Sequence, residues 1–164
     1  MSKEVLIFTT IGTLTIITLL STTALSRFGG ILSLPLPIAN VWALNVTGTE
    51  GPDTLKGTAE KDTIRGYGGD DIISGLSGND AIRGDKGDDT IHGDEGKDRI
   101  RGDSGNDMIF GDNGNDILIG GPGDDTFTGG SGKDTFNCGV GNDTVMDFDR
   151  VINDTVMASC ENVR

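Results

Sequence analysis

The chain has few of the residue types on which catalytic and nucleic-acid-binding sites depend. Among its 164 residues there are one histidine, one tryptophan, one tyrosine and two cysteines. A lone histidine excludes a multi-histidine zinc site, and no plausible serine completes a catalytic triad with it. Thirteen basic residues stand against 26 acidic ones, a formal net charge of −13. That balance excludes the basic surface that nucleic-acid binding requires.

Catalytic motifs and an ordinary hydrophobic core are also missing. Neither HExxH nor GxSxG occurs, which argues against a zinc protease and against a hydrolase with a nucleophile elbow. Aromatic residues are 5% of the chain, too few for an ordinary globular core. Glycine contributes 27 residues, but not at every third position, so a collagen triple helix is excluded.

The chain does have an internal repeat, a nine-residue unit that recurs eleven times without an insertion over residues 48–146. The clearest copies read GGPGDDTFT (residues 120–128) and GGSGKDTFN (residues 129–137). Position one is glycine except at Cys138, and position four is glycine except at Glu60. Position six is aspartate in every copy: Asp53, Asp62, Asp71, Asp80, Asp89, Asp98, Asp107, Asp116, Asp125, Asp134 and Asp143. Position eight is apolar in every copy: Leu55, Ile64, Ile73, Ile82, Ile91, Ile100, Ile109, Leu118, Phe127, Phe136 and Val145.

Each unit divides into a turn and a short strand. The first six residues are glycine, polar and acidic, which is typical of turns, and the last three centre one apolar residue, as in a strand with one buried face. A turn followed by a strand reverses the chain, so two consecutive units predict one full coil. The fold class we predict is all-β: two parallel sheets back to back in a solenoid of about five and a half coils, with position eight between the sheets.

Coiling would bring aspartates two units apart together at the two edges, which gives nine neighbouring pairs from Asp53–Asp71 to Asp125–Asp143. Two carboxylates that close repel each other, and a hard divalent cation relieves the repulsion. Ca²⁺ takes about six to eight oxygen ligands, and carbonyls of glycine-rich turns can supply the rest. Residues 48–146 carry 21 acidic and 9 basic side chains, so we expect the repeat array to fold only when Ca²⁺ binds.

These units resemble the RTX, or haemolysin-type, calcium-binding nonapeptide repeats. The resemblance covers 99 of the 164 residues and implies a parallel β-roll with Ca²⁺ in its turns. We expect about six to nine ions bound by the position-six aspartates, with interior aspartates bridging two ions. The chain departs from the family pattern at position two, which is glycine only in the last three copies. Pro52 and Glu60 also stand in the turns of the first two copies, where we expect the weakest sites.

Acidic residues also occupy position two in the fifth to eighth copies: Asp85, Asp94, Asp103 and Asp112. They are either further ligands or solvated turn residues, and the second interpretation is favoured. His92, at an outward ninth position, lacks partners at ligand spacing and is interpreted as a surface residue.

Positions seven and nine should face solvent and are mostly Thr, Arg, Lys and Ser. The seventh and eighth copies are the exception: Met108, Phe110, Ile117 and Ile119. We interpret these four as one apolar cluster, either a partner surface or a surface covered by the chain's own C-terminal tail, and we favour the tail.

The N-terminal residues 1–43 are predicted to be a signal peptide or membrane anchor plus a linker. Residues 5–26 carry no charge, which fits either an export signal cleaved after Ala24 or Ala43 or an anchor helix long enough to span a bilayer. Both alternatives place the repeat array outside the cell, where Ca²⁺ is abundant. The predicted location is therefore secreted or cell surface, with membrane contact only through residues 5–26 if they are retained.

The C-terminal residues 147–164 break the period and are predicted to cap the open end of the β-roll, which occupies residues 44–146. Cys138 and Cys160 are the only cysteines, and an even pair in an exported protein predicts a disulfide between the cap and the last repeat. The alternatives are a free thiol pair and a metal site, and a metal site would need further ligands that are not present.

The function predicted from the sequence is that of an exported, non-enzymatic protein that binds Ca²⁺ and serves an extracellular structural or interaction role. Its partners would be calcium ions and an extracellular molecule that the sequence does not identify, and not nucleic acid. The alternative is an accessory or targeting module of a secreted enzyme or toxin system with similar repeats, because the chain has no segment left to carry such chemistry itself.

Overall fold

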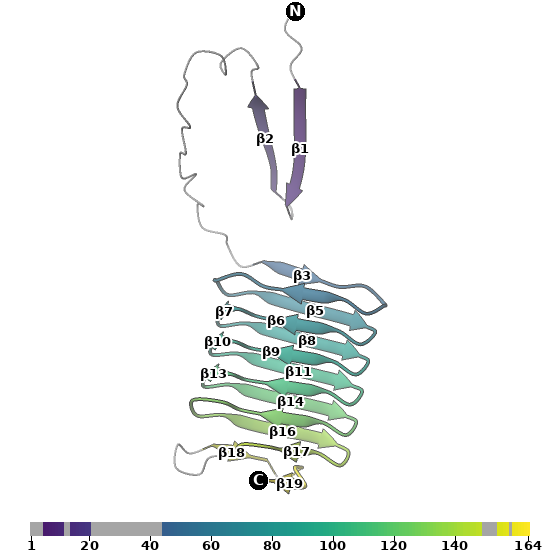
Figure 1. Ribbon diagram of the computed structural model, residues 1–164, viewed down its shortest axis with the longest axis vertical. Coiled ribbons are helices and arrows are strands. Elements are labelled where there is room, and N and C mark those ends of the chain that lie inside the picture. The colour runs from purple at the N-terminus through teal and green to yellow at the C-terminus, as the bar shows by residue number, and fades with distance from the viewer. Residues whose placement is uncertain (1–4, 12–13, 21–43, 149–153, 158) are drawn as a thin grey trace, which may run out of the picture. The chain divides into compact units, whose positions relative to one another are not determined.

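A computed structural model describes the chain over residues 5–11, 14–20, 44–148, 154–157 and 159–164. The chain divides into two compact units, Met1–Asn40 and Val41–Arg164. The second unit is a solenoid that contains the whole repeat array (Figure 1).

In the first unit, strands β1 (Val5–Ile11) and β2 (Leu14–Leu20) pair antiparallel, with Val5 opposite Leu20 and Ile11 opposite Leu14. Residues 21–43 lie outside the described residues, so export and anchoring through the N-terminal segment stay predictions. Within the part of the chain that the structure describes, no helix is long and apolar enough to cross a membrane.

The solenoid consists of two seven-stranded parallel sheets, which run along its two sides (Figure 1). The first sheet contains β3 (Asn45–Thr47), β5 (Thr63–Gly68), β8 (Ala81–Lys86), β11 (Arg99–Ser104), β14 (Ile117–Pro122), β16 (Thr135–Val140) and β18 (Thr155–Val156). The second sheet contains β4 (Thr54–Lys56), β6 (Ile72–Ser74), β9 (Thr90–His92), β12 (Met108–Phe110), β15 (Thr126–Thr128), β17 (Thr144–Val145) and β19 (Asn162–Val163). A small third sheet lies at one turn edge and contains β7 (Ser77–Gly78), β10 (Glu95–Gly96) and β13 (Asn113–Gly114).

The strand register confirms that two nine-residue units form one coil. Ile64 pairs with Ile82 in the first sheet, and Ile73 pairs with Ile91 in the second, so each residue pairs with its counterpart two units later. The predicted all-β parallel roll is therefore correct. The first sheet differs in one respect: five of its strands are six residues long, because pairing continues beyond position nine into the next turn, as where Tyr67 pairs with Asp85.

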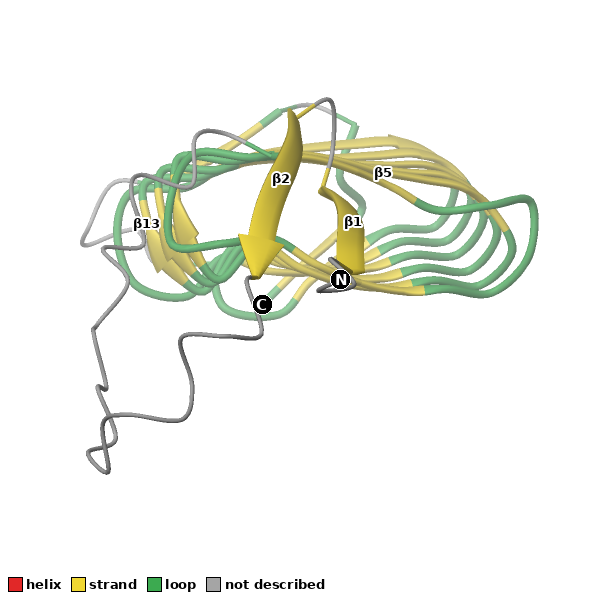
Figure 2. Cartoon of the chain, turned by 90° about the horizontal axis from the view of Figure 1, so that it is seen from above, coloured by secondary structure: helices red, strands yellow, loops and turns green. Residues whose placement is uncertain are grey.

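The hydrophobic core is the single layer of position-eight side chains between the two sheets. Figure 2 shows the two strand layers and the turns that join them at both edges. Ten of the eleven position-eight side chains are at most 2% exposed, and Leu55 in the first copy is 9% exposed. The rings of Phe127 and Phe136 meet edge to face, with 6.2 Å between their centroids. This thin core fixes the spacing of the sheets and so positions the turns at either edge.

Position two of the turn has a left-handed backbone from the third copy on. Its φ is +78° at Tyr67, +74° at Leu76 and +80° at Asp85, and it stays positive to the last copy. Glycine adopts this conformation without strain, whereas in other residues it costs about 1–2 kcal/mol. Six non-glycine residues accept that strain here: Tyr67, Leu76, Asp85, Asp94, Asp103 and Asp112.

The C-terminal tail forms one more coil. Its strands β18 and β19 pair with β16 and β17, so each of the two sheets ends in a strand that the repeat array does not supply. Cys138 is fully buried, and its sulfur is at bonding distance from that of Cys160, with 5.1 Å between the Cα atoms. The two cysteines are thus adjacent, and a disulfide that joins the tail to the last repeat stays a prediction.

The apolar cluster predicted on the surface is wrong. Met108 and Phe110 are on β12 in the second sheet, whereas Ile117 and Ile119 are on β14 in the first sheet, so the two pairs face opposite sides. The reason is that consecutive units always lie in different sheets. The described strands of the tail extend the sheet ends and pair only with β16 and β17, so the tail strands do not cover these faces.

Candidate metal centre

The position-six aspartates lie at the ends of the turns, immediately before the strands begin. All of them from Asp62 to Asp143 are at most 2% exposed, although each is a charged residue type. Asp53, in the first copy, is half-buried. Ten buried carboxyls in one small solenoid are unusual, because a buried carboxylate needs hydrogen bonds or a counter-charge.

One oxygen of each carboxyl is used to join the coils. The backbone N–H of each position-six aspartate donates to Oδ1 of the position-six aspartate two units later, at 2.7–2.9 Å in all nine pairs from Asp53–Asp71 to Asp125–Asp143. These are the nine pairs that the period predicts. The aspartates are therefore neighbours, but their direct contact is between a backbone amide and a side chain.

The other oxygen has no hydrogen-bond partner in nine of the copies. These buried atoms are the Oδ2 atoms of Asp71, Asp80, Asp89, Asp98, Asp107, Asp116, Asp125, Asp134 and Asp143. A buried charged oxygen without a partner destabilises a fold by several kcal/mol or is neutralised by a proton or a cation. The regular recurrence of the same orphaned atom points to a repeated ligand of opposite charge.

Position one, which lies beside Oδ2 of the same unit, is glycine in ten copies and Cys138 in the last copy, that of Asp143. A Cβ placed on any of the ten position-one glycines would lie less than 3.0 Å from Oδ2 of the aspartate in the same unit. At eight of them it would also lie less than 3.0 Å from the position-one carbonyl oxygen two units later: Gly48, Gly57, Gly66, Gly75, Gly84, Gly93, Gly111 and Gly120. A carboxylate oxygen and a carbonyl oxygen thus converge on one point in each of these turns.

Burial shifts the titration of the central carboxyls. It raises the pKa of Asp89, Asp107 and Asp116 to about 7 and that of Asp98 and Asp125 to about 6, from an ordinary value of 3.8. Loss of hydration is the largest cause, the amide hydrogen bond to Oδ1 opposes it, and neighbouring aspartates raise the pKa further. The same causes raise the pKa of the outer four: Asp71, Asp80, Asp134 and Asp143.

The donor set fits a hard cation with mixed ligands. Among the described residues, no group of three or more His, Cys, Asp and Glu side chains is placed to hold a metal ion. The described residues therefore do not offer the cluster of side-chain ligands that a soft or transition metal prefers. Calcium accepts backbone carbonyls together with carboxylates, which is the pair of oxygens that converges in these turns. The residues present fit Ca²⁺.

The first two copies differ from the rest. The hydroxyl Oγ1 of Thr49 donates to Oδ2 of Asp53, and that of Thr58 donates to Oδ2 of Asp62, both at 2.9 Å. The backbone amides of the same threonines also donate to these Oδ2 atoms. Threonine at position two thus satisfies the oxygen that is orphaned elsewhere. The prediction from Pro52 and Glu60 that the sites here are the weakest stays a prediction, and the threonine contacts are a separate difference between these copies and the rest.

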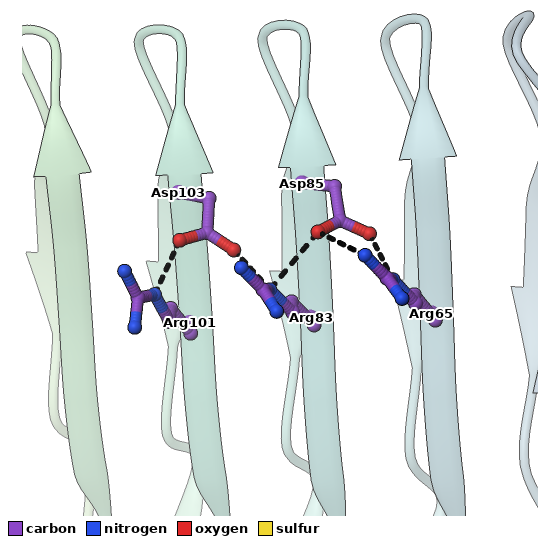
Figure 3. Close-up of polar contacts among 5 residues, drawn as sticks. All are labelled: Arg65, Arg83, Asp85, Arg101 and Asp103. Carbon is purple, nitrogen blue, oxygen red and sulfur yellow. Dashed lines mark hydrogen bonds and ion pairs between the residues drawn. The ribbon is translucent and has the colours of Figure 1, made fainter.

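The acidic residues at position two have side-chain partners within the solenoid, and two of them are buried. Asp85 and Asp103 are 9% and 8% exposed and lie between arginines of adjacent strands (Figure 3). Asp85 pairs with Arg65 and with Arg83, whose Nε lies 2.9 Å away, and Asp103 pairs with Arg83 and Arg101. Hydrogen bonds to these carboxylates raise the pKa of Arg65 and Arg83.

The other two position-two aspartates bind partners in the second sheet. Ser74 donates its hydroxyl to Asp94 at 2.6 Å, and Nδ1 of His92 lies 2.9 Å from Asp112. The His92 ring also stacks on Phe110, with 4.4 Å between the centroids. In each case the partner stands at position nine of the unit three copies earlier. Sequence reasoning missed this pairing because it joins two positions of different units in neighbouring coils.

The tail supplies acidic residues that the sequence analysis did not count. Asp134 donates its amide to Oδ1 of Asp154 at 2.9 Å, and Asp143 donates to Oε2 of Glu161 at 3.1 Å, so both occupy the position-six register. The signal was present in the sequence, since residues 154–157 repeat the letters DTVM of residues 143–146. Asp147 accepts the amides of Gly129 and Gly130 at 2.7 and 2.8 Å.

Comparison with known proteins agrees with this geometry. The four-copy model of the RTX calcium-binding nonapeptide repeat matches residues 47–82, 74–109 and 110–145, which together make up more than half of the chain. No curated protein and no solved structure matches the chain.

Proposed function

Because the chain belongs to the RTX calcium-binding nonapeptide repeat family, we propose that it is a calcium-binding protein whose solenoid folds as Ca²⁺ fills its stacked turns. The side-chain ligands are the position-six aspartates: Asp53, Asp62, Asp71, Asp80, Asp89, Asp98, Asp107, Asp116, Asp125, Asp134 and Asp143. Among them, the nine from Asp71 to Asp143 bind first, because their Oδ2 atoms have no other partner.

The observation that carries the proposal is the orphaned Oδ2 repeated nine times in buried turns. Without a cation, each turn buries a carboxyl that must either hold a proton or remain an uncompensated charge. A bound Ca²⁺ supplies the missing positive charge in each turn. The residues of the chain then hold the geometry: Oδ1 ties adjacent coils together, Oδ2 faces the ion, and the glycine at position one leaves room for it.

We propose that about six to nine ions bind. The lower bound follows from the turns in which an orphaned Oδ2 and a backbone carbonyl converge: those of Asp71, Asp80, Asp89, Asp98, Asp116 and Asp125. The upper bound adds Asp107, Asp134 and Asp143, whose Oδ2 atoms are also orphaned. Asp53 and Asp62 would join last, because a bound ion there must displace a threonine hydroxyl.

Calcium titration tests the proposal. Isothermal titration calorimetry and circular dichroism, performed on the same sample, should show uptake of several ions together with a gain of β-structure. A chain that takes up no calcium, or that has the same strand content in chelator as in millimolar Ca²⁺, would contradict it. Mg²⁺ at the same concentration is the matched control, since it demands a smaller octahedral site and holds its water more tightly.

The wider role that we propose is extracellular, structural or interactive, and not enzymatic. Residues 1–43 would direct export or anchor the chain, residues 44–146 would form the calcium roll, and residues 147–164 would cap it. Extracellular calcium, near 10⁻³ M, suits modules of this kind, which bind at roughly 10⁻⁴–10⁻³ M. The contact between Cys138 and Cys160 supports a disulfide, which an oxidising compartment would maintain. Mass spectrometry of the mature protein tests both the N-terminus and the disulfide.

A further inference from the structure

Most acidic side chains of the solenoid lie in its turns, whereas positions seven and nine of the first sheet carry four arginines. Asp85 and Asp103, near the ends of β8 and β11, are acidic residues of this sheet and lie between three of these arginines. Positions seven and nine of its strands β5 to β16 contain no acidic residue: Thr63, Arg65, Ala81, Arg83, Arg99, Arg101, Ile117, Ile119, Thr135 and Asn137. Four of the seven arginines in the chain are in this set. In a chain of net charge −13, such a concentration of positive charge on one face calls for a ligand or a structural reason.

The four arginines surround a shallow hollow of about 280 Å³. Arg65, Arg83 and Arg101 stand in register on the adjacent strands β5, β8 and β11, and Arg99 lies two residues before Arg101. The hollow exists because Ala81, at position seven of β8, is small and leaves its floor open between Thr63 and Arg99. Its lining contains no carboxylate.

Three of these guanidinium groups are held in place from one side. Asp85 and Asp103 bind the Nε edges of Arg65, Arg83 and Arg101, as Figure 3 shows. The two aspartates occupy the left-handed position where glycine would be unstrained, with φ of +80° and +78°. The strain, about 1–2 kcal/mol each, is accepted at positions that orient arginines. If this row of ion pairs served only to stabilise the sheet, it would not account for Arg99, which is not part of the row.

Arg99 is the arginine without such a partner. Its side chain is exposed, and no ion pair or hydrogen bond of that side chain is found among the described residues of the solenoid. It lines the hollow together with the other three and stands at position seven of β11, whereas they stand at position nine of their strands. Because the lining arginines come from two positions of the strand, a group with three oxygens can contact more than one fork at once, whereas a planar carboxylate presents two oxygens in one plane.

We propose that this arginine hollow binds sulfate esters of an extracellular polysaccharide. Adjacent strands are about 4.8 Å apart, so the row Arg65–Arg83–Arg101 spans about 10 Å and suits a linear chain with several anionic groups. A single small anion would bind weakly, because the net negative charge of the chain repels it. The inference goes beyond the calcium sites and rests on the proposed function for the folded sheet and for the extracellular location.

Other polyanions fit the surroundings less well. A membrane presents a broad negative plane, and it would press against the acidic turns on both edges of the sheet, which carry Asp70, Asp88, Glu95 and Asp124 among others. A nucleic acid needs aromatic or basic surfaces along its length, and the row carries one aromatic neighbour, Tyr67, already covered by Arg65 at 4.5 Å. A narrow chain lying along the row avoids both difficulties.

The test uses the full chain saturated with calcium and immobilised heparin as the sulfated polysaccharide. Arg99→Ala removes an anion contact without breaking the row of ion pairs, and we expect binding to weaken roughly three- to tenfold. Ala81→Glu places a carboxylate in the floor and should abolish binding, whereas Ala81→Gln, of the same size but neutral, should retain most of it. Arg164→Ala, at the C-terminal end of the solenoid, is the matched arginine control and should bind like the wild type.

Calcium uptake is measured on every variant and should be unchanged, because none of these residues faces an orphaned Oδ2. Normal calcium uptake with no heparin binding by the wild type would overturn this inference alone and leave the proposed function intact. Wild-type affinity in both Arg99→Ala and Ala81→Glu would also overturn it. Equal binding of polygalacturonate, which carries only carboxylates, or of single-stranded DNA, would refute the assignment to sulfate esters. Inorganic sulfate should compete only at millimolar concentration.

Discussion

The first two repeats and the nine that follow have the same aspartate in the same register, but not the same chemistry. In the first two, a threonine at position two donates to Oδ2 of Asp53 or Asp62. In the other nine, the residue at position two is not threonine and has a left-handed backbone. Oδ2 of the aspartate is buried there without a partner. From this comparison we infer that an aspartate at position six is not enough for the proposed cation site, and that its second oxygen must also lack a hydrogen-bond partner.

The difference follows from the backbone as much as from the side chain. Thr49 and Thr58 do not have a positive φ, whereas the residue at position two has a left-handed backbone from Tyr67 onward. β-Branched residues strongly disfavour that conformation. A threonine at position two therefore both changes the turn and caps the carboxylate. In the N-terminal coil, threonine hydrogen bonds satisfy Oδ2, whereas in the later coils we propose that a bound cation does so.

Calcium removal should produce the largest effect and should divide the two regions. In chelator at pH 7.5, we expect the nine later repeats to lose their strand content, because each would bury an unpaired carboxylate. Amide hydrogen exchange, read by mass spectrometry, would report this loss repeat by repeat. Uniform protection across all eleven repeats in chelator would show that the unsatisfied oxygens do not matter.

Substitution of ligands should come next in size. Asp98→Ala combined with Asp107→Ala removes one orphaned Oδ2 from each edge, in the middle of the array, and should lower the calcium stoichiometry by at least two. Asp53→Ala combined with Asp62→Ala is the control. At calcium concentrations that fill only the nine later sites, it should leave the stoichiometry unchanged because those two oxygens already accept threonine hydroxyls. Equal losses of calcium in the two double variants would remove the distinction between the regions.

Acid should replace calcium in part. The pKa of Asp89, Asp107 and Asp116 is raised to about 7 in the fold, so their stabilising protonated form is fully present below pH 4 and is lost as the pH rises through 7. Calcium-free protein should therefore contain more β-structure at pH 4.5 than at pH 7.5, and its calcium affinity should fall as the pH is lowered over the same interval. Circular dichroism in metal-depleted buffer measures the first effect, and strand content independent of pH would refute it.

Conversion of one turn should have the smallest effect. Thr58→Gly removes the hydroxyl from Asp62 and permits a left-handed position two, so the site should resemble the later ones. We expect the stoichiometry to rise by at most one ion, with little change in the thermal midpoint at saturating calcium. Thr54→Gly, outside the turn on β4, serves as the control for the glycine substitution, and a similar rise there would discredit the capping explanation.

Much of the fold followed from the period. Eleven aspartates and eleven apolar residues at fixed positions predict the two-unit coil, the two parallel sheets, the core layer and the nine neighbouring pairs, and the register confirms them. The period also misled in one place. Met108, Phe110, Ile117 and Ile119 were treated as one cluster because they are close in sequence, although consecutive units belong to opposite sheets.

The sequence predicted which residues form the candidate site, but not which of their atoms are free to bind an ion. The sequence identified the position-six aspartates, but not that Oδ1 is consumed by an amide while Oδ2 is orphaned. It also missed Asp154 and Glu161. Asp154 lies 20 residues after Asp134, whereas the repeat spacing is 18, and Glu161 has the regular spacing of 18 from Asp143 but is not an aspartate. Contacts between position nine and position two, as between Arg83 and Asp103, join units three copies apart and are invisible to a nine-residue period.

The sequence by itself determined the repeat, the direction of each side chain and the acidity of the turns, because a fixed period and a fixed strand geometry allow one arrangement of inward and outward positions. The tertiary structure alone decided which carboxylate oxygens are satisfied and which arginines meet on one face. Both depend on distances between adjacent coils, and those distances are set by packing and hydrogen bonding between residues that the chain order keeps apart.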